Sequence, residues 1–401
     1  MSAHDHPRGT PVPDIRLGSS LVGVQRWAGV IGALCLILCC AGYFANPTEF
    51  FHSYLFAYLY WMGFTLGGLG ILLMNNVVGG RWGASTRSFL IAAMRTLPWM
   101  LLLILPFFLG MADIYPWADP KRLHHDPILW HKRHYLNLPF FWIRVAVYFA
   151  IWVFWGFRVQ RMSDRLDQTG DGAVLLRMRR FSAPGLLIFV MAGTFAYIDW
   201  ILSADTQFFS TIYGAMILIG DVLQTFALTI VFLVIASKGD RFGGRISSPL
   251  LHEIGNMMFA FTIFWTYLSV SQLIIVWPAN LPQEIGWYLV RVRGGWTVIA
   301  AAVALAMFAI PFLALLSQAR KQNPRRLIRV AVWLLFARVV DVFWIVVPTY
   351  RTNGFYLYWT DFAAFFGVGG VWLFLYLRFL RERPLYPLRD PRLIALPEAA
   401  A

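Results

Sequence analysis

Ionisable side chains in the middle of long apolar stretches are the residues of this sequence best suited to chemistry. Asp221 falls near the centre of one such stretch, and Arg338 and Asp341 fall near the centre of another. Residues three apart share one face of a helix, so Arg338 and Asp341 can pair with each other or with Asp221. Because a charged group in hydrocarbon is costly, groups kept there mark functional sites, and carboxylates at such depth suit proton relay.

Further polar residues extend this pattern along the apolar stretches. His252 and Glu253 open one stretch, and Gln272 lies toward its other end. A second interpretation stays open, in which buried ion pairs fix the register of the helices without moving a proton. In the first interpretation, we predict an interrupted proton pathway through Asp221, His252, Glu253, Gln272, Arg338 and Asp341. Secondary polar candidates are Arg95, Arg144, Asp199 and Asp361.

Two segments resemble metal sites without meeting the requirements of one. The first contains His124, His125, His131 and His134. Their spacing matches no compact metal motif, and Lys132 and Arg133 would repel a cation. Residues 167–172 mimic the start of a calcium loop, but Met178 stands where a bidentate Glu is required. We therefore predict no metal site and no catalytic residue in this chain.

Long apolar segments must position these side chains. Of the 401 residues, 59% are hydrophobic and only 13% are charged, a composition that suits a helical bundle in lipid and not a soluble protein. The apolar runs are continuous, whereas the strands of a membrane barrel alternate, so the sequence predicts an all-α membrane protein. Ten runs are long enough to cross a bilayer as helices. They are residues 22–43, 51–75, 88–110, 138–157, 181–203, 208–236, 250–276, 294–317, 327–348 and 355–379.

Lys and Arg follow the alternation of sides that ten spans impose. One side, which includes both chain ends, holds 23 of them in or beside its loops, against 7 in the loops of the opposite side. The positive-inside rule therefore places both termini in the cytoplasm. We expect a cytoplasmic N-terminal tail (1–21), a ten-helix membrane domain (22–381) and a cytoplasmic C-terminal tail (382–401). This bias accounts for the net charge of +14, so the expected partner is membrane lipid and not nucleic acid.

Short motifs along nearly the whole chain resemble one family, the F subunit of alternative complex III, a bacterial quinol:electron-acceptor oxidoreductase. The motifs that carry this resemblance include Asp126-Pro-Ile-Leu129, Tyr135-Leu-Asn-Leu-Pro-Phe-Phe-Trp-Ile-Arg144, Asp199-Trp-Ile-Leu-Ser203, His252-Glu-Ile-Gly255, Arg338-Val-Val-Asp341, Gly367-Val-Gly-Gly370 and Asp390-Pro-Arg-Leu393. Subunits of this type belong to the wider NrfD and polysulfide-reductase membrane-subunit group. The resemblance implies two four-helix bundles, helices two to five and six to nine, flanked by helices one and ten.

The resemblance also implies partners and a location. The partners would be a sister NrfD-like C subunit together with iron-sulfur and cytochrome c subunits on the outer side of the bacterial inner membrane. Iron-sulfur clusters and c-type haems would reside in those partners. No C-x-x-C-H motif occurs here, which excludes a covalently attached haem in this chain. We expect no cofactor bound by this chain, although quinone or quinol is possible.

Three functions follow as alternatives. The first is a multi-pass subunit without catalysis of its own, which anchors the complex and conducts protons coupled to quinol oxidation. The second is direct quinol binding in an outer-leaflet pocket near Asp199, Arg144 or Gln272. The third is a stand-alone secondary transporter, which would use broken helices and inverted repeats. We expect the spans to be mostly uninterrupted despite Pro98 and Pro106, which disfavours the transporter.

Overall fold

The computed structural model describes residues 20–237, 247–387 and 389–394. These residues form helices joined by turns, and none of them lies in a strand. Nine of their helices are long and apolar enough to cross a membrane, or ten if one bent helix pair counts as a single span. The predicted all-α membrane protein is thus confirmed. The predicted N-terminal tail lies almost wholly outside the described residues.

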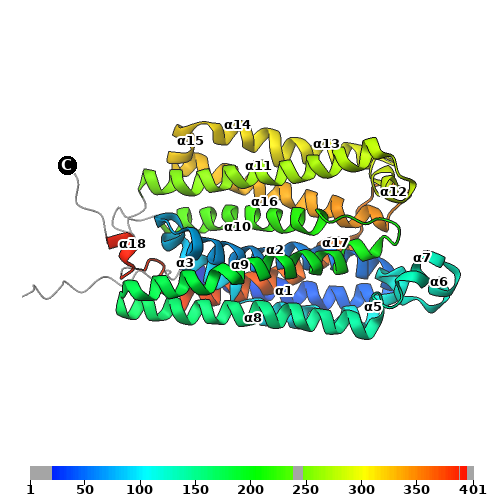
Figure 1. Ribbon diagram of the computed structural model, residues 1–401, viewed down its shortest axis with the longest axis horizontal. Helices are drawn as coiled ribbons and strands as arrows, with labels where there is room; N and C mark the ends of the chain where they lie inside the picture. Colours follow the sequence, from blue (N-terminus) through cyan, green and yellow to red (C-terminus); the bar gives the residue numbers. More distant parts are fainter. Residues whose placement is uncertain (1–19, 238–246, 388, 395–401) are drawn as a thin grey trace, which may run out of the picture.

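Helices occupy all ten predicted spans (Figure 1). In chain order they are α1 (Ser20–Ala45), α2 (Pro47–Val78), α3 to α5 (Arg81–Met94, Leu97–Leu103 and Phe107–Ile114), α8 (Leu138–Thr169), α9 (Gly172–Trp200), α10 (Tyr213–Ser237), α11 (Ser248–Ala279), α13 and α14 (Trp296–Ala304 and Ile310–Leu316), α16 (Pro324–Val346) and α17 (Trp359–Arg381). Shorter helices lie between them or follow them: α6 (Pro120–His125), α7 (Pro127–Lys132), α12 (Pro282–Arg291), α15 (Gln318–Gln322) and α18 (Pro391–Ile394).

The third predicted span is broken, so our expectation of an uninterrupted helix is wrong there. It consists of α3, α4 and α5, and the chain bends by 76° between Leu103 and Phe107. Pro98 stands at the start of α4 and Pro106 caps α5. A proline lacks the backbone N–H of the helical ladder and clashes with the preceding turn, so each one ends a helix and starts another. Average hydropathy does not register such a break.

The predicted loop 158–180 is instead a helical hairpin. α8 continues to Thr169, and Gly170 ends it in the left-handed conformation at φ 67°. Asp171 then caps α9, since its side chain accepts the N–H of Ala173 at 2.8 Å. The residues that mimic a calcium loop are therefore the end of one helix and the cap of the next. Hydropathy found only the apolar part of each helix.

Small residues let the helices at the centre approach closely. α2 lies among α3, α9, α10 and α17, and a Cβ added at its Gly67 would meet the backbone carbonyl of Asp221 on α10. α1 packs along α17, where Gly32 and Gly370 meet backbone to backbone. Dispersion at such contacts holds helices together in lipid, where the hydrophobic effect cannot. α10 in turn contacts α9, α11 and α16.

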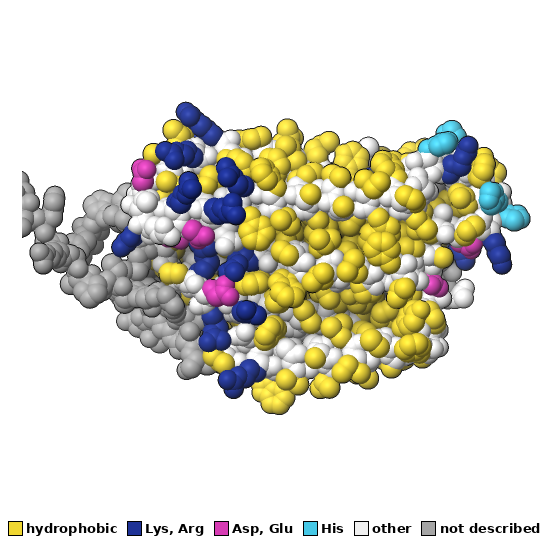
Figure 2. Space-filling view, turned by 90° about the horizontal axis from the view of Figure 1, so that it is seen from below, with side chains coloured by type: hydrophobic (Ala, Val, Ile, Leu, Met, Phe, Trp, Pro, Cys, Tyr) yellow, Lys and Arg dark blue, Asp and Glu magenta, His cyan; other side chains and the backbone are white. Residues whose placement is uncertain are grey.

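The surface divides into an apolar middle and a basic end (Figure 2). Large apolar side chains stand outward, including Phe44 at 83%, Leu109 at 73% and Val298 at 70% exposure. Lys and Arg gather on the visible face near one end (Figure 2). The turn between α8 and α9 and helix α18 lie at this same end (Figure 1). An apolar belt of this extent suits a lipid environment.

Candidate functional site

Two carboxylates at the centre of the molecule share one guanidinium. Arg338 on α16 donates from Nη2 to Asp221 Oδ1 on α10 at 3.1 Å, and from Nη1 to Oδ2 of Asp341. The same Nη2 also donates to the carbonyl of Ile217 at 3.1 Å. The three side chains are at most 2% exposed. The structure thus brings together the three residues that the spacing had paired, with both possible pairings present at once.

In this triad of Asp221, Arg338 and Asp341, the two carboxylates have different hydrogen-bond partners. Tyr197 on α9 donates its hydroxyl to Oδ2 of Asp221, so Asp221 has two donors. Among the described residues, Asp341 receives a hydrogen bond from Arg338 alone. A Cβ at Gly220 would strike the guanidinium, which explains the glycine beside the triad. The Nε of Arg338 is buried without a partner in the described part of the chain.

Asp341 borders a cavity of about 310 Å³ between α11, α12, α13 and α16. Its walls are mostly aromatic and aliphatic, and Gln272 is one of the few polar groups in them. The indole N–H groups of Trp265 and Trp344, which also line the cavity, are buried and have no partner among the described residues. Buried polar groups are normally satisfied, so this cavity is suited to hold water or a ligand with acceptor oxygens.

The cavity connects the triad to the outer part of the predicted pathway. Gln272 is 4% exposed, and its Oε1 accepts the hydroxyl of Ser210 at 2.5 Å. Ser210 lies in the half-buried segment before α10. Val270 and Leu273, also in the cavity wall, are exposed on the apolar surface. The cavity therefore reaches both a polar route along Gln272 and the lipid-facing side of the bundle.

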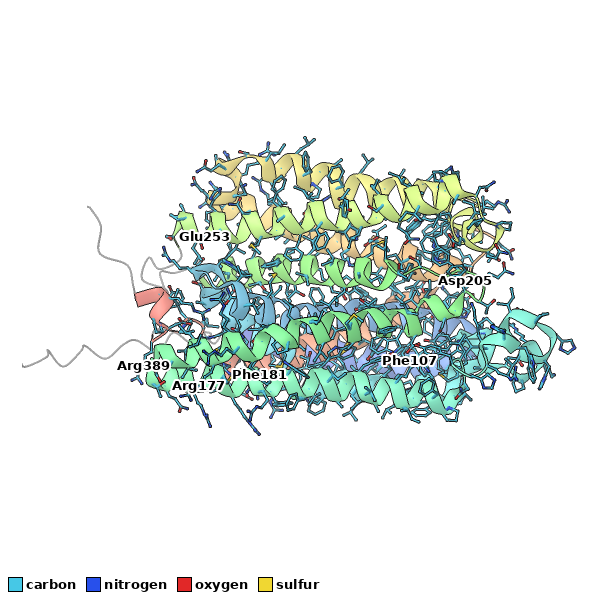
Figure 3. The ribbon with its side chains drawn as sticks, viewed as in Figure 1. Phe107, Arg177, Phe181, Asp205, Glu253 and Arg389 are labelled. Atoms are coloured by element: carbon cyan, nitrogen blue, oxygen red, sulfur yellow. The ribbon has the colours of Figure 1, made fainter. Side chains whose placement is uncertain are left out.

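The inner part of the predicted pathway is not assembled in the same way. His252 and Glu253 are half-buried in the second turn of α11, and Figure 3 shows Glu253 at the opposite end of the molecule from Asp205. No hydrogen bond between described residues joins either of them to Asp221. Polar side chains on α10 continue from Asp221 toward that end: Thr225 donates to the carbonyl of Asp221 at 2.8 Å, and Thr229 donates to the carbonyl of Thr225 at 2.8 Å.

The secondary candidates lie apart from the triad. Arg144 on α8 donates two hydrogen bonds to the carboxylate of Asp199 on α9, at 2.7 and 3.1 Å. The hydroxyl of Tyr148 donates a third at 2.7 Å. This pair is buried, and neither residue lines the cavity beside Asp341. Arg95 lies at the basic end instead, where its Nη1 is 2.6 Å from Oε2 of Glu382. Both arrangements are ion pairs between neighbouring segments.

Asp361 belongs to an ion cluster, at the end of the molecule opposite the basic end, that the sequence analysis did not predict. Arg351 donates to both of its carboxylate oxygens at 2.9 and 3.0 Å and to Glu49 Oε2 at 2.8 Å. The hydroxyl of Tyr356 donates to the other Glu49 oxygen at 2.6 Å. Glu49 and Asp361 are far apart in the sequence, so its spacing gave no signal of this cluster. The cluster joins the starts of α2 and α17.

A second missed cluster ties the C-terminal segment to the basic end. Arg87 on α3 binds Asp390 at 2.8 Å and also pairs with Asp167 on α8. Burial would raise the pKa of Asp390, but hydrogen bonds from Arg392 and the charge of Arg87 outweigh it and hold that pKa below its ordinary value. Asp390 opens one of the motifs that carried the resemblance. Its role here is to dock the segment before α18.

No group of three or more His, Cys, Asp or Glu side chains in the described part of the chain is arranged to hold a metal ion. His125 instead bonds the carbonyl of Lys121 through Nδ1 at 2.7 Å. Comparison with known proteins adds no assignment. No family model matches this chain. No curated protein matches it either.

Proposed function

We propose that this chain is a proton-conducting membrane subunit of a quinol-oxidising respiratory complex of the alternative complex III type. One observation carries the proposal: two buried carboxylates share one guanidinium, and one of them borders a cavity. Arg351 and Arg87 also bind two carboxylates each, but Glu49 and Asp167 are partly exposed, whereas both acids beside Arg338 are buried. With both carboxylates ionised, the triad carries one net negative charge, which one proton would neutralise.

In this proposal the protons move between Asp341 and water in the cavity. Gln272 and Ser210 continue the route toward the outer side, and the hydroxyls of Thr225 and Thr229 lead toward the inner side, where Glu253 accepts protons from the cytoplasm. Asp221, held by Tyr197 and Arg338, is the fixed counter-ion. The remaining features are proposals as well. The cytoplasmic termini rest on the positive-inside rule. The two four-helix bundles, the bacterial inner membrane, the sister C subunit, and the haem and iron-sulfur partners rest on the resemblance.

The test replaces Asp341 with Asn in the assembled complex and measures protons moved per electron in proteoliposomes. We expect a lower ratio, with quinol oxidation retained, because the amide keeps the shape of the side chain but carries no exchangeable acid proton. Asp199→Asn is the matched control, since Asp199 is equally buried and ion-paired but lies apart from the cavity. An unchanged ratio with intact turnover in both Asp221→Asn and Asp341→Asn would remove the proton pathway.

A second candidate function is quinol binding in the same cavity. The unpartnered N–H groups of Trp265 and Trp344 suit the carbonyl oxygens of a quinone, and the cavity wall is open to lipid at Val270 and Leu273. The guanidinium of Arg291 lies 3.5 Å over the ring of Trp287, another wall residue, and would favour an anionic quinol. A photoreactive quinone should label α11 or α16 of this chain, and Trp344→Phe should reduce the labelling. Labelling confined to a sister subunit contradicts this candidate.

The broken third span is the one feature that favours a stand-alone transporter. Purification in mild detergent separates this possibility from the first two. A respiratory subunit should bring haem-containing partners with it, whereas a transporter should purify alone.

A further inference from the structure

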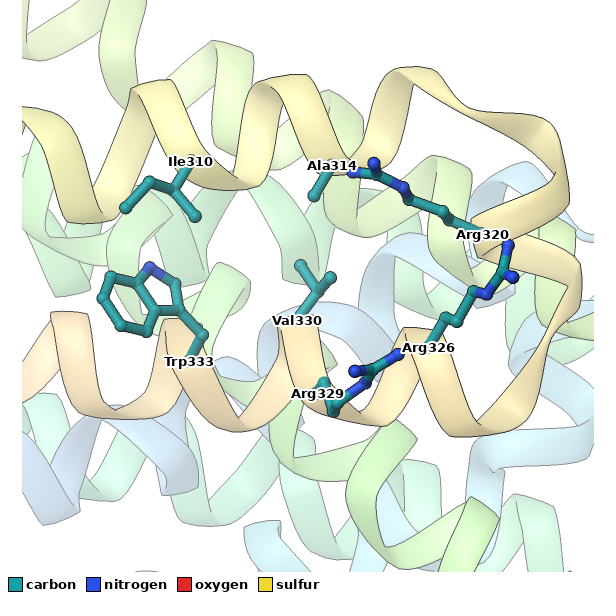
Figure 4. Close-up of a pocket in the computed structure, with 7 residues that line it drawn as sticks. All are labelled: Ile310, Ala314, Arg320, Arg326, Arg329, Val330 and Trp333. Atoms are coloured by element: carbon teal, nitrogen blue, oxygen red, sulfur yellow. The ribbon is translucent and has the colours of Figure 1, made fainter.

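A groove at the basic end lies between α14, α15 and the first turns of α16 (Figure 4). It has a volume of about 580 Å³ and seven lining residues. In Figure 4, Arg320 stands on one side, and Arg326 and Arg329 stand on the other. The rest of the wall is Ile310, Ala314, Val330 and Trp333. The groove therefore has a cationic part and an apolar part.

The cationic part is uncompensated. All three arginines are exposed, and none forms an ion pair with an acidic side chain in the described part of the chain. Arg329 Nε donates only to the carbonyl of Arg325 at 3.2 Å, which leaves its terminal nitrogens available. Guanidinium groups bind phosphate oxygens in a fork, so three of them in one groove suit one or two phosphates.

The apolar part continues toward the lipid-facing belt. Ile310 is 45% exposed and Trp333 is 38% exposed. The indole N–H of Trp333 is bound to the carbonyl of Ala306 at 3.0 Å, so the ring is fixed with its apolar surface in the groove wall. Basic groups beside such a wall, where the apolar belt ends, match the boundary between lipid tails and headgroups.

We infer that this groove binds an anionic phospholipid. The arginines hold the headgroup phosphate, and an acyl chain lies along Ile310, Ala314, Val330 and Trp333. Free phosphate would leave that apolar wall uncovered, and a zwitterionic lipid would place its own cation among the arginines. Three cations also favour a lipid with two phosphates over a lipid with one. This inference does not depend on the proposed proton pathway, because the groove is separate from the triad.

The test uses the full chain in detergent, stripped of lipid, and titrates cardiolipin, phosphatidylglycerol or phosphatidylcholine during native mass spectrometry. We expect binding in that order of affinity. In the variant with Arg320, Arg326 and Arg329 each replaced by Gln, each lost charge should weaken cardiolipin binding about fivefold, hence on the order of a hundredfold together.

The control variant carries Gln at Arg161, Arg177 and Arg180, which are exposed at the same end and also lack an ion-paired acid among the described residues. It changes the charge equally but leaves the groove intact, so cardiolipin affinity should stay within about twofold of the original chain. Millimolar inorganic phosphate should not displace the lipid. Equal affinity for phosphatidylcholine, equal losses in the two variants, or displacement by phosphate each overturns the inference.

Discussion

Replacing Arg338 should destabilise the protein far more than replacing either carboxylate that it binds. Arg338→Gln leaves Asp221 and Asp341 buried without a counter-ion, whereas Asp341→Asn leaves a neutral pair of Arg338 and Asp221. The triad thus responds unequally to the loss of a cation and the loss of an anion. This inequality follows from the two-to-one count of charges.

The size of each effect follows from the bonds that are lost. Removing one partner of a buried ion pair costs about 3–5 kcal/mol of unfolding free energy, because a charge is left unpaired. Asp341→Asn only replaces the carboxylate acceptor of Arg338 by a neutral amide oxygen, a loss of about 1 kcal/mol. In a triple variant that adds Asp221→Asn and Asp341→Asn to Arg338→Gln, no charge is left unpaired. We therefore expect the two added substitutions to restore about 2 kcal/mol or more.

Unfolding in mixed micelles with increasing SDS, followed by the fluorescence of the 18 tryptophans, measures these differences. Arg293→Gln is the control, because Arg293 is exposed and should change stability by less than about 0.5 kcal/mol. The reasoning fails if Arg338→Gln costs no more than Asp341→Asn. It also fails if the two asparagine substitutions add to the loss instead of reversing it.

Three further predictions concern other parts of the structure. Gly370→Leu should lower the unfolding free energy by about 1–3 kcal/mol, because a side chain there meets the backbone of α1. Gly23→Leu, with open space around it, should not lower it. Equal thermal midpoints for the two variants would contradict this prediction. Arg351→Met should cost about 3–5 kcal/mol, since Asp361 loses its counter-ion, and an SDS midpoint equal to that of the unmodified chain would count against the cluster. The pKa of Asp390 is lowered in the folded protein, so its contribution to folding stability is present above the ordinary value of 3.8 and is lost only as the pH falls through the lower folded value. Hydrogen exchange should therefore show residues 389–394 protected from pH 7 down to that ordinary value. Release of this segment near neutral pH would refute the assignment.

The positions of the membrane helices were predictable because lipid thickness imposes a minimum apolar length. The break in the third span was not, since Pro98 and Pro106 interrupt hydrogen bonding without lowering hydropathy. The long helical hairpin of α8 and α9 was missed for the opposite reason: its outer turns are polar, and only the cap geometry at Gly170 and Asp171 reveals where the helices end.

The site was predictable only where one helix supplies the geometry. Arg338 and Asp341 pair because they are one turn apart on α16. The contact of Tyr197 with Asp221 joins two helices, and the cavity needs side chains from α10, from α11 to α13 and from α16. Position along an apolar stretch was a poor guide to contact, since no hydrogen bond between described residues joins Glu253 to the triad.

The contrast between the two carboxylates is what separates proton conduction from helix pairing. If the triad only fixed α10 against α16, the bond between Arg338 and Asp221 would suffice, and Tyr197 already completes the surroundings of Asp221. A second buried acid beside the same cation then adds unneeded negative charge. Asp341 has a single donor and borders the cavity, so it is the group that water can reach and the one whose charge can change. Proton transfer should consequently respond to Asp341→Asn more strongly than to Asp221→Asn.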